Sequence, residues 1–294
     1  MKYLVTGGAG FIGSHLVDAL IVKGHQVIVI DNLSTGKKSN LNPRAKFYKK
    51  DIHNYKSIKP FFAGMDGVFH LAAMPSVQLS IVHPLESHDI NANGVLNVLM
   101  AAKEAGARRL VFSSSCAVYG DSDGKILKKE NMKAAPKSPY ALHKYIGEEY
   151  AKLFSDLYGV ETVNLRYFNV YGPRMAESGP YSGVIKIFLK QKADGKPFTI
   201  TGDGKQIRDY VFVEDVARAN ILAMRSKKAG KGEIINIGSG KNYSVNQLAD
   251  LIGGPKKYIA PRAEMRHALA DISKAKSLLG WQPMISLEKG LKLI

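Results

Sequence analysis

Residues 2–31 read KYLVTGGAGFIGSHLVDALIVKGHQVIVID, and this stretch decides the fold. The apolar run Lys2–Thr6 stops at a cluster of glycines, and Phe11–Val22 then carries apolar residues at helical spacing. Residues 27–30 form a continuous β-branched run, which is typical of a strand buried on both faces of a parallel sheet. The stretch therefore predicts a strand, a glycine turn, a helix and a second strand, which together make one right-handed βαβ unit.

Strands and helices continue to alternate after this unit. Continuous apolar runs predict strands, and apolar residues spaced three and four apart predict helices. The expected strands cover residues 67–71, 109–113 and 161–168, and the expected helices cover residues 91–105 and 140–158. This order predicts an α/β fold with a doubly wound parallel sheet of the Rossmann type.

The texture of the sequence changes after Gly172-Pro173. Residues 175–183 form an aperiodic stretch with Gly, Ser and Pro, which is typical of a functional loop. The short elements beyond it are helices at residues 184–192, 213–224, 245–251 and 272–279 and strands at residues 198–200 and 234–237. We expect a Rossmann domain at residues 1–172, which also receives segments near residues 205–240. A smaller C-terminal α/β domain at residues 173–294 mainly binds substrate in this prediction.

The composition is typical of a globular protein from a reducing compartment. Hydrophobic residues make up 45% of the 294 residues and charged residues 23%, which excludes disordered and fibrous classes. The single cysteine, Cys116, excludes an internal disulfide and a cysteine metal cluster, and the sequence predicts no metal site. No apolar run is long enough for a membrane helix and no signal peptide is evident. We therefore expect a cytoplasmic protein with no membrane partner.

The charge balance is strongly basic. Lysine and arginine outnumber aspartate and glutamate by 42 to 25, which gives a net charge of +17 and raises nucleic acid as a partner. However, the basic residues come mostly as scattered pairs such as Lys37-Lys38 and Lys256-Lys257, without a basic tail or an RNA-binding motif. This distribution is typical of a solvated surface, and we expect no specific nucleic-acid binding.

Glycines 7, 10 and 13 lie between the first predicted strand and the first predicted helix. Gly7 allows the tight turn, Gly10 lets a pyrophosphate approach the backbone, and Gly13 lets the helix pack closely on the strand. The helix N-terminus then faces the anion. Asp31 ends the next strand, where its carboxylate would accept hydrogen bonds from ribose hydroxyls and repel a 2′-phosphate. The pattern predicts dinucleotide binding, with NAD preferred over NADP.

Tyr140 and Lys144 lie four residues apart near the start of a predicted helix, so they share one face. A nearby ammonium and a positive nicotinamide ring would both favour the phenolate, which can act as a base. Such a pair is common on exposed helices and is not diagnostic alone. It gains weight because Ser113-Ser114-Ser115 ends the preceding buried strand, at the sheet edge where ligands bind. One of these hydroxyls could hydrogen-bond the reacting oxygen.

Four motifs stand in order along the chain. They are Gly7-x-x-Gly10-x-x-Gly13, Ser113-Ser114-Ser115-Cys116-Ala117-Val118-Tyr119-Gly120, Tyr140-x-x-x-Lys144 and LRYFNVYGPR at residues 165–174. In this combination the whole chain resembles the extended short-chain dehydrogenase/reductase family, and most closely its UDP-glucose (UDP-galactose) 4-epimerases. Nucleotide-sugar 4,6-dehydratases of this superfamily carry Asp and Glu where this chain has Cys116 and Ala117, and UDP-glucuronate decarboxylases carry Glu at the Ala117 position. The resemblance therefore implies epimerisation through a transient 4-keto sugar, with a place in galactose metabolism.

The resemblance also implies roles for individual residues. Ser115, Tyr140 and Lys144 match the catalytic residues of the family. The positions that match its NAD site are Gly7, Gly10, Phe11, Ile12, Gly13, Asp31, Asn32, Asp51, Ile52, Leu71, Ala72, Ala73, Asn91, Ser113, Tyr140, Lys144 and Tyr167. The positions that match its UDP-sugar site are Ser115, Asn169, Arg208, Arg262 and Ala268. Of these, the two arginines would grip the diphosphate, and the small Ala268 would leave room around the 2-position of the sugar.

Three questions stay open at this point. The resemblance implies a homodimer in which residues 91–105 and 140–158 of two subunits pair. A UDP-glucuronate 4-epimerase, or another enzyme that oxidises C4 of a nucleotide sugar, is the first alternative. It should carry an extra cation for the sugar carboxylate, and Met175-Ala176-Glu177 offers none. The second alternative is a non-catalytic NAD-binding regulator, against which Ser115, Tyr140 and Lys144 argue. The sequence does not decide between plain and N-acetylated sugars.

Overall fold

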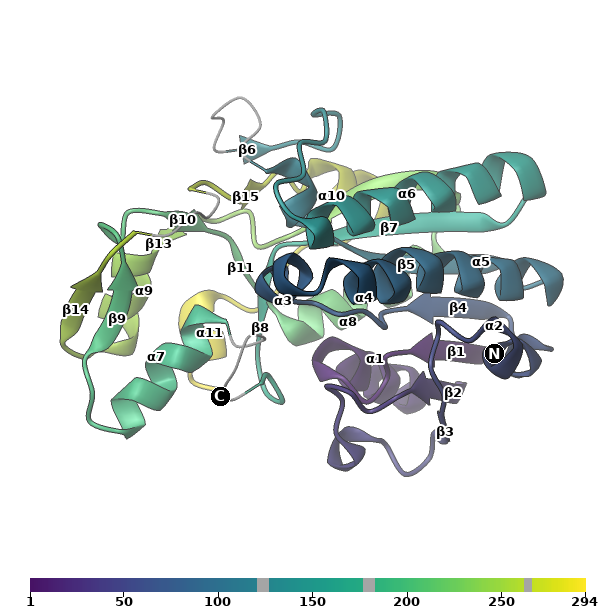
Figure 1. Ribbon diagram of the computed structural model, residues 1–294, viewed down its shortest axis with the longest axis horizontal. Coiled ribbons are helices and arrows are strands. Elements are labelled where there is room, and N and C mark those ends of the chain that lie inside the picture. The colour runs from purple at the N-terminus through teal and green to yellow at the C-terminus, as the bar shows by residue number, and fades with distance from the viewer. Residues whose placement is uncertain (121–126, 177–182, 262–265) are drawn as a thin grey trace.

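The central element of the fold is a parallel sheet of seven strands (Figure 1). The computed structural model describes residues 1–120, 127–176, 183–261 and 266–294. The seven strands are β1 (Lys2–Thr6), β2 (Gln26–Asp31), β3 (Lys46–Lys49), β4 (Gly67–His70), β5 (Arg109–Ser115), β7 (Glu161–Tyr167) and β12 (Lys231–Ile237). Their order in the sheet is β12-β7-β5-β4-β1-β2-β3, which confirms the predicted doubly wound α/β fold. The chain changes direction across the sheet between β1 and β4, and ligands of such sheets bind beyond the carboxyl ends at this point.

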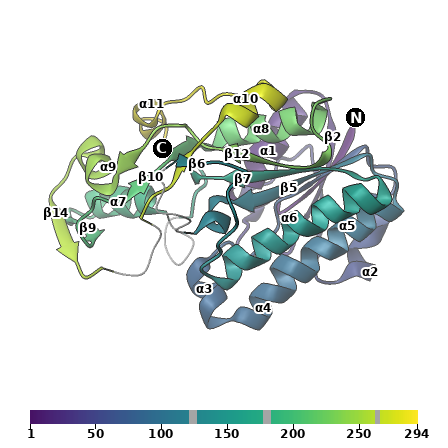
Figure 2. The same cartoon turned by 90° about the horizontal axis from the view of Figure 1, so that it is seen from above.

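Helices cover both faces of this sheet, as Figure 2 shows. One face packs against α1 (Phe11–Val22), α8 (Val213–Arg225) and α10 (Ser273–Leu279). The other face packs against α2 (Tyr55–Ile58), α5 (Gly94–Glu104) and α6 (Pro139–Tyr158). The two short helices α3 (Val77–Val82) and α4 (Pro84–His88) adjoin α6. Because Tyr3 and Val5 face one helical layer and Leu4 faces the other, β1 is apolar at each of these positions.

Clear sequence signals bound the two helices that carry the candidate site. α1 follows the glycine turn, and the chain leaves it at Gly24, which has a φ of +78°. α6 begins with Pro139 in its first turn, and the hydroxyl of Ser138 accepts a hydrogen bond from the N–H of Ala141. It ends at Gly159, which adopts the left-handed conformation.

Most of the remaining C-terminal half forms a second apolar core beside the sheet (Figure 1). Its helices are α7 (Val184–Ala193), α9 (Val245–Ile252) and α11 (Leu287–Leu291). Its short strands pair as β8 (Asn169–Tyr171) with β11 (Tyr210–Phe212), β9 (Phe198–Thr201) with β14 (Lys256–Ile259), and β10 (Ile207–Arg208) with β13 (Tyr243–Ser244). A further pair joins β6 (Leu127–Lys128) to β15 (Leu269–Ala270). The division into domains at residues 1–172 and 173–294 stays a prediction.

Short turns of other helical types complete the described chain. They are 3₁₀ turns at Lys38–Asn40, Lys59–Phe62 and Cys116–Tyr119 and a π-helical turn at Asp89–Asn93. Among the described residues, no helix has the length and apolar character that a membrane span requires.

Candidate active site

The glycine turn between β1 and α1 has room for backbone only. Gly7 has a φ of +73°, and a Cβ there would lie 2.7 Å from the backbone nitrogen of Ala72. A Cβ on Gly13 would lie 2.1 Å from the carbonyl oxygen of Gly7. α1 begins after Gly10 without a side-chain cap, which leaves its first N–H groups for a ligand. The cradle therefore fits the pyrophosphate that the glycine pattern predicts.

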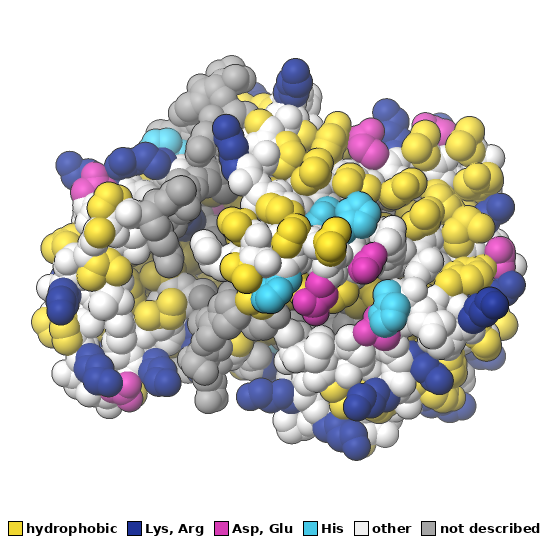
Figure 3. Space-filling view, in the orientation of Figure 1, with side chains coloured by type: hydrophobic (Ala, Val, Ile, Leu, Met, Phe, Trp, Pro, Cys, Tyr) yellow, Lys and Arg dark blue, Asp and Glu magenta, His cyan; other side chains and the backbone are white. Residues whose placement is uncertain are grey.

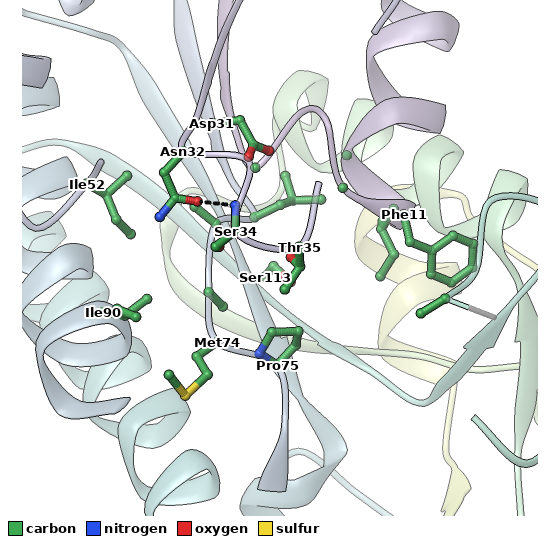
Figure 4. Close-up of a pocket in the computed structure, with 18 of the residues that line it drawn as sticks. Phe11, Asp31, Asn32, Ser34, Thr35, Ile52, Met74, Pro75, Ile90 and Ser113 are labelled. Carbon is green, nitrogen blue, oxygen red and sulfur yellow. Dashed lines mark hydrogen bonds between the residues drawn. The ribbon is translucent and has the colours of Figure 1, made fainter. Parts of the chain in front are cut away.

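A cavity of about 410 Å³ lies at the carboxyl ends of the central strands (Figure 4). The residues that line it come from the glycine turn, from the ends of β2, β4, β5 and β7, and from the start of α6. The structure thus brings together residues that lie far apart in the sequence. The predicted NAD-site residues that line the cavity are Gly7, Gly10, Phe11, Ile12, Gly13, Asp31, Asn32, Asp51, Ile52, Leu71, Ala72, Ala73, Ser113, Tyr140, Lys144 and Tyr167.

Asn91 is the predicted NAD-site residue that does not line this cavity. Its side chain accepts a hydrogen bond from the N–H of Met74 at 2.8 Å and donates one to the Met74 carbonyl at 3.1 Å. It also donates to the hydroxyl of Ser87 at 3.3 Å. Because Met74 lines the cavity, Asn91 supports the wall of the site from behind.

Asp31 lies at the end of β2 with only 8% of its surface exposed. Its carboxylate accepts hydrogen bonds from the N–H of Ala9 at 3.0 Å and from the N–H of Leu33 at 2.8 Å. Burial raises the pKa of Asp31, and these two N–H groups act in the opposite direction. Leu33 has a φ of +62°, a strained conformation for leucine that fixes the loop against the carboxylate.

The structure adds cavity residues that the sequence reasoning missed. Figure 4 shows Ser34 and Thr35 on the loop after β2, and Met74 and Pro75 on the segment after β4. These four residues follow predicted strand ends by one to four positions in the sequence. Closeness in sequence to Asp31 or Ala73 would therefore have identified them as cavity residues. Glu86 and Ile90 gave no such signal, because helical turns from elsewhere in the chain bring them in. Arg174 and Met175 did lie in predicted features, since Arg174 ends the fourth motif and Met175 begins the predicted functional loop.

Ser115, Tyr140 and Lys144 line the same cavity as the glycine turn. The side chain of Ser115 interacts with the hydroxyl of Tyr140. The Nζ of Lys144 donates to the carbonyl oxygen of Ser113 at 2.6 Å and lies 5.9 Å from the centre of the Tyr140 ring. The N–H of Tyr140 donates to the hydroxyl of Ser80 on α3 at 3.1 Å, which fixes the first turn of α6.

Burial is the largest influence on the pKa values of Tyr140 and Lys144. It raises the pKa of Tyr140 to about 12, although the hydrogen bond from Ser115 acts in the opposite direction. It also lowers the pKa of Lys144 to about 7, although the negative charge of Glu148 raises it. The side chains of the protein therefore keep the Tyr140 phenol protonated at neutral pH. The predicted shift toward phenolate consequently depends on the second positive charge of that prediction, the nicotinamide ring.

The predicted UDP-sugar residues are placed less closely together. The amide of Asn169 donates to the Asp209 carbonyl at 3.2 Å, and the guanidinium of Arg208 donates to the Ile207 carbonyl at 2.9 Å. Neither Asn169 nor Arg208 lines the 410 Å³ cavity. Ala268 is fully buried in an apolar cluster with Tyr119, Phe168 and Ala270. Arg262 lies outside the described residues.

The fold and the cradle can now be compared with known proteins. Residues 3–238 match the NAD dependent epimerase/dehydratase family. The chain belongs to this family. NAD is accordingly its cofactor, and the glycine cradle, Asp31 and the cavity they share fit that dinucleotide.

Three relatives are similar to this chain over nearly the whole length of both proteins. The crystal structure of the UDP-glucose 4-epimerase of Thermotoga maritima with UDP-glucose is 43% identical with a TM-score of 0.94, covering 100% of this chain and 97% of the other. The UDP-N-acetylglucosamine 4-epimerase of Methanobrevibacter ruminantium, in complex with UDP-N-acetylmuramic acid, is 39% identical with a TM-score of 0.93, covering 99% and 96%. The UDP-glucose 4-epimerase of Mycolicibacterium smegmatis is 37% identical over 99% of this chain and 96% of its own.

Proposed function

We propose that this chain is an NAD-dependent 4-epimerase of UDP-hexoses, with UDP-glucose and UDP-galactose as its substrate pair. The observation that carries the proposal is that Ser115, Tyr140 and Lys144 line the same cavity as the glycine cradle. It puts an acid–base group beside the cofactor site. Membership of the epimerase/dehydratase family and the similarity to epimerases of two kinds of UDP-sugar support it.

The glycine cradle and Asp31 would hold NAD, which would supply a reversible hydride acceptor for C4 of the sugar, so the reaction would involve no net oxidation. Tyr140 removes the proton of the C4 hydroxyl as the hydride leaves, and gives a proton back in the second half of the reaction. Ser115 hydrogen-bonds the same oxygen and keeps it beside the phenol. Lys144, anchored on the Ser113 carbonyl, supplies a positive charge that favours the deprotonated form of Tyr140.

Inversion at C4 also requires that the 4-keto sugar presents its other face before the hydride returns. A firm hold on UDP combined with a loose hold on the sugar would allow this turn. Arg208 and Arg262 would supply the firm hold on the diphosphate, and Asn169 would contact the same group. Ala268 is fully buried in an apolar cluster, so its small side chain would affect the room around the sugar only through the residues of that cluster.

The test is incubation of the purified protein with UDP-glucose, UDP-N-acetylglucosamine or UDP-glucuronate, with the products separated by chromatography. Formation of UDP-galactose from UDP-glucose is the expected result. Turnover of UDP-glucuronate alone would favour the glucuronate epimerase instead. Bound NAD without turnover of any of the three substrates would favour the non-catalytic regulator.

We also propose a homodimer, in which α5 and α6 of two subunits pack together. Exposed apolar side chains on α6 support this arrangement, since Leu153, Leu157 and Tyr158 are each about half exposed or more. A cytoplasmic location and a place in galactose metabolism belong to the same proposal. A chain with one cysteine fits the reducing conditions of the cytoplasm.

A further inference from the structure

Three consecutive serines at the end of β5 contact three residues of α6 that lie one turn apart. The side chain of Ser115 interacts with the hydroxyl of Tyr140, and the carbonyl of Ser113 accepts a hydrogen bond from Lys144. The hydroxyl of Ser114 donates to the carboxylate of Glu148. Residues at positions i, i+4 and i+8 of a helix lie along one stripe, so this stripe of α6 is fastened to the strand end at three successive points.

Glu148 is the member of this stripe that does not line the cavity. Its side chain is fully buried and is bound by Arg166 on β7 through two hydrogen bonds of 2.8 and 2.7 Å. Arg166 lies directly opposite Ser114 in the register of β5 and β7, so the carboxylate joins both strands to α6. The guanidinium of Arg166 in turn lies 4.5 Å from the centre of the Tyr119 ring.

We infer that Glu148 is a positioning residue of the active site, which fixes the height of α6 over β5 and keeps Lys144 in its charged form. The inference rests on the roles proposed above for Tyr140 and Lys144. Glu148 acts through these two residues and through Ser114, and it touches neither the cofactor cavity nor the reacting atoms.

The energetics of the buried pair support this role. Burying a carboxylate and a guanidinium carries a large desolvation cost for each ion, and apolar residues of the same volume often give an equally stable protein. Stability alone therefore does not explain why Glu148 and Arg166 are buried together. Glu148 lies one helical turn from Lys144, and an effect on Lys144 does explain it. A buried ammonium loses its proton easily, and a carboxylate nearby opposes that loss.

The other titratable groups around Lys144 do not replace Glu148. His70 on β4 is fully buried, and burial together with the charge of Lys144 lowers its pKa to about 3, so it is neutral. Tyr140 is protonated in the absence of further positive charge, and Arg166 on β7 is positive and already bound to Glu148. Glu148 is thus the negative charge that faces Lys144 among the described residues.

The sign of the expected pH effect follows from this arrangement. Lys144 needs its proton to act, and Glu148 raises the pKa of Lys144. Glu148→Gln should therefore lower that pKa, and the loss of function at alkaline pH should begin at a lower pH than in the wild type. If the pKa of Lys144 falls by about one unit from about 7, the ratio of variant to wild-type kcat/KM should fall roughly fivefold between about pH 6 and about pH 8.5.

The experiment compares the holoenzyme of the wild type, Glu148→Gln and Glu149→Gln across this pH range. Glu149 is the neighbouring exposed glutamate, so its variant removes the same charge from the surface of α6. Two readouts are measured, namely kcat/KM with UDP-glucose and the NAD that stays bound to each chain after gel filtration. The second readout does not depend on which sugar the enzyme takes. An alkaline loss of both that moves to lower pH in Glu148→Gln alone supports the inference.

Identical pH profiles in Glu148→Gln and the wild type would overturn it. If Glu148→Gln does not fold, Glu148→Met combined with Arg166→Met removes both charges together and leaves neither ion unpaired. A shifted profile in this double variant supports the inference, whereas an unchanged profile, or failure to fold, assigns the pair to the fold alone. A Lys144→Met variant tests the role of Lys144 separately: if both its kcat/KM and its NAD retention equal those of the wild type at each pH, the proposed role of Lys144 fails first.

Discussion

Ser113, Ser114 and Ser115 show what the sequence can say about single residues. Their place after a buried apolar run predicted that they lie at the carboxyl edge of the sheet, and the structure has them lining the cavity there. Their separate partners could not be predicted. Which hydroxyl meets Tyr140 and which meets Glu148 depends on how α6 lies over β5, and that follows from packing in three dimensions.

Tyr140→Phe tests the proton-transfer step. The variant keeps the ring and loses the hydroxyl, so we expect NAD to remain bound while epimerisation falls by about 10²- to 10⁴-fold, as for loss of a general base. Product chromatography measures the rate, and absorbance of the released nucleotide measures bound NAD. Near-normal turnover would remove Tyr140 from the mechanism. Tyr145→Phe, one turn away on the same helix and outside the cavity, is the matched control.

Asp31→Ala tests the choice of cofactor. The carboxylate at the end of β2 is held by the N–H groups of Ala9 and Leu33, and in our interpretation it accepts hydrogen bonds from the ribose hydroxyls. Its removal should weaken NAD binding roughly tenfold or more, and NADP binding much less, because the charge that repels a 2′-phosphate is lost as well. Dissociation constants for both dinucleotides measure the effect. An equal loss for both would contradict the assignment.

At the scale of elements, prediction worked where local signals bound a buried segment. The predicted helix Phe11–Val22 coincides with α1, since the glycine turn and Gly24 enclose it. The predicted helix at residues 140–158 differs from α6 by one residue, because Ser138 and Gly159 supply its cap and its end. The helix expected at residues 91–105 does not coincide with one α-helix of the structure, because its first three residues belong to a π-helical turn. Helical turns run from Pro84 through a π-helical turn at Asp89–Asn93 into α5.

Three of the strands that the sequence reasoning missed, β3, β6 and β15, lack a buried apolar run of their own. β3 has one half-buried and three exposed residues, since it is the edge strand of the sheet, and it shows no strand pattern. β6 and β15 are two residues each and exist because they pair with each other across a long stretch of chain. Tertiary contacts decide such segments, and propensity and periodicity do not record those contacts.

Gly13→Ala tests the element that opens the fold. The new Cβ would lie 2.1 Å from the carbonyl oxygen of Gly7, so β1 and α1 must separate for it to fit. We expect a loss of about 1–3 kcal/mol in the free energy of unfolding and a loss of NAD from the purified protein. Thermal unfolding and nucleotide release measure the two effects. Gly183→Ala is the control, since its Cβ would meet only the Met175 sulfur at 3.8 Å. Equal stability and equal NAD retention in the two variants would contradict this prediction and show that the glycine turn accommodates a Cβ at residue 13.

At the scale of the whole molecule, the surface is uneven. Figure 3 shows hydrophobic side chains gathered over the face that carries α5 and α6, while lysines and arginines are spread along the rim. Scattered positive charges fit the expectation of a solvated surface. A contiguous apolar face of this kind is typical of a surface that another protein covers.

The proposed dimer makes a definite prediction for this face. Leu157 is 66% exposed on α6, and Leu157→Glu would put a charge into the interface. We expect the molecular mass in sedimentation to change from that of two chains to that of one, at micromolar concentration. Val22→Glu is the control, because Val22 is 83% exposed on α1 and lies away from α6. A wild type that sediments as a single chain would contradict the dimer.

The position of β12 at the edge of the central sheet has a consequence for biosynthesis. β12 is formed by Lys231–Ile237 and pairs with β7, which ends at Tyr167. On the ribosome, β7 is therefore made well before its outer neighbour, and its open edge can pair with other nascent chains in the meantime. Trp281 is fully buried in the core on the side of the sheet that α1, α8 and α10 cover, and it is translated later still. The unpaired edge of β7 stays exposed until residue 237 emerges, so it is the part of the growing chain that a chaperone would shield.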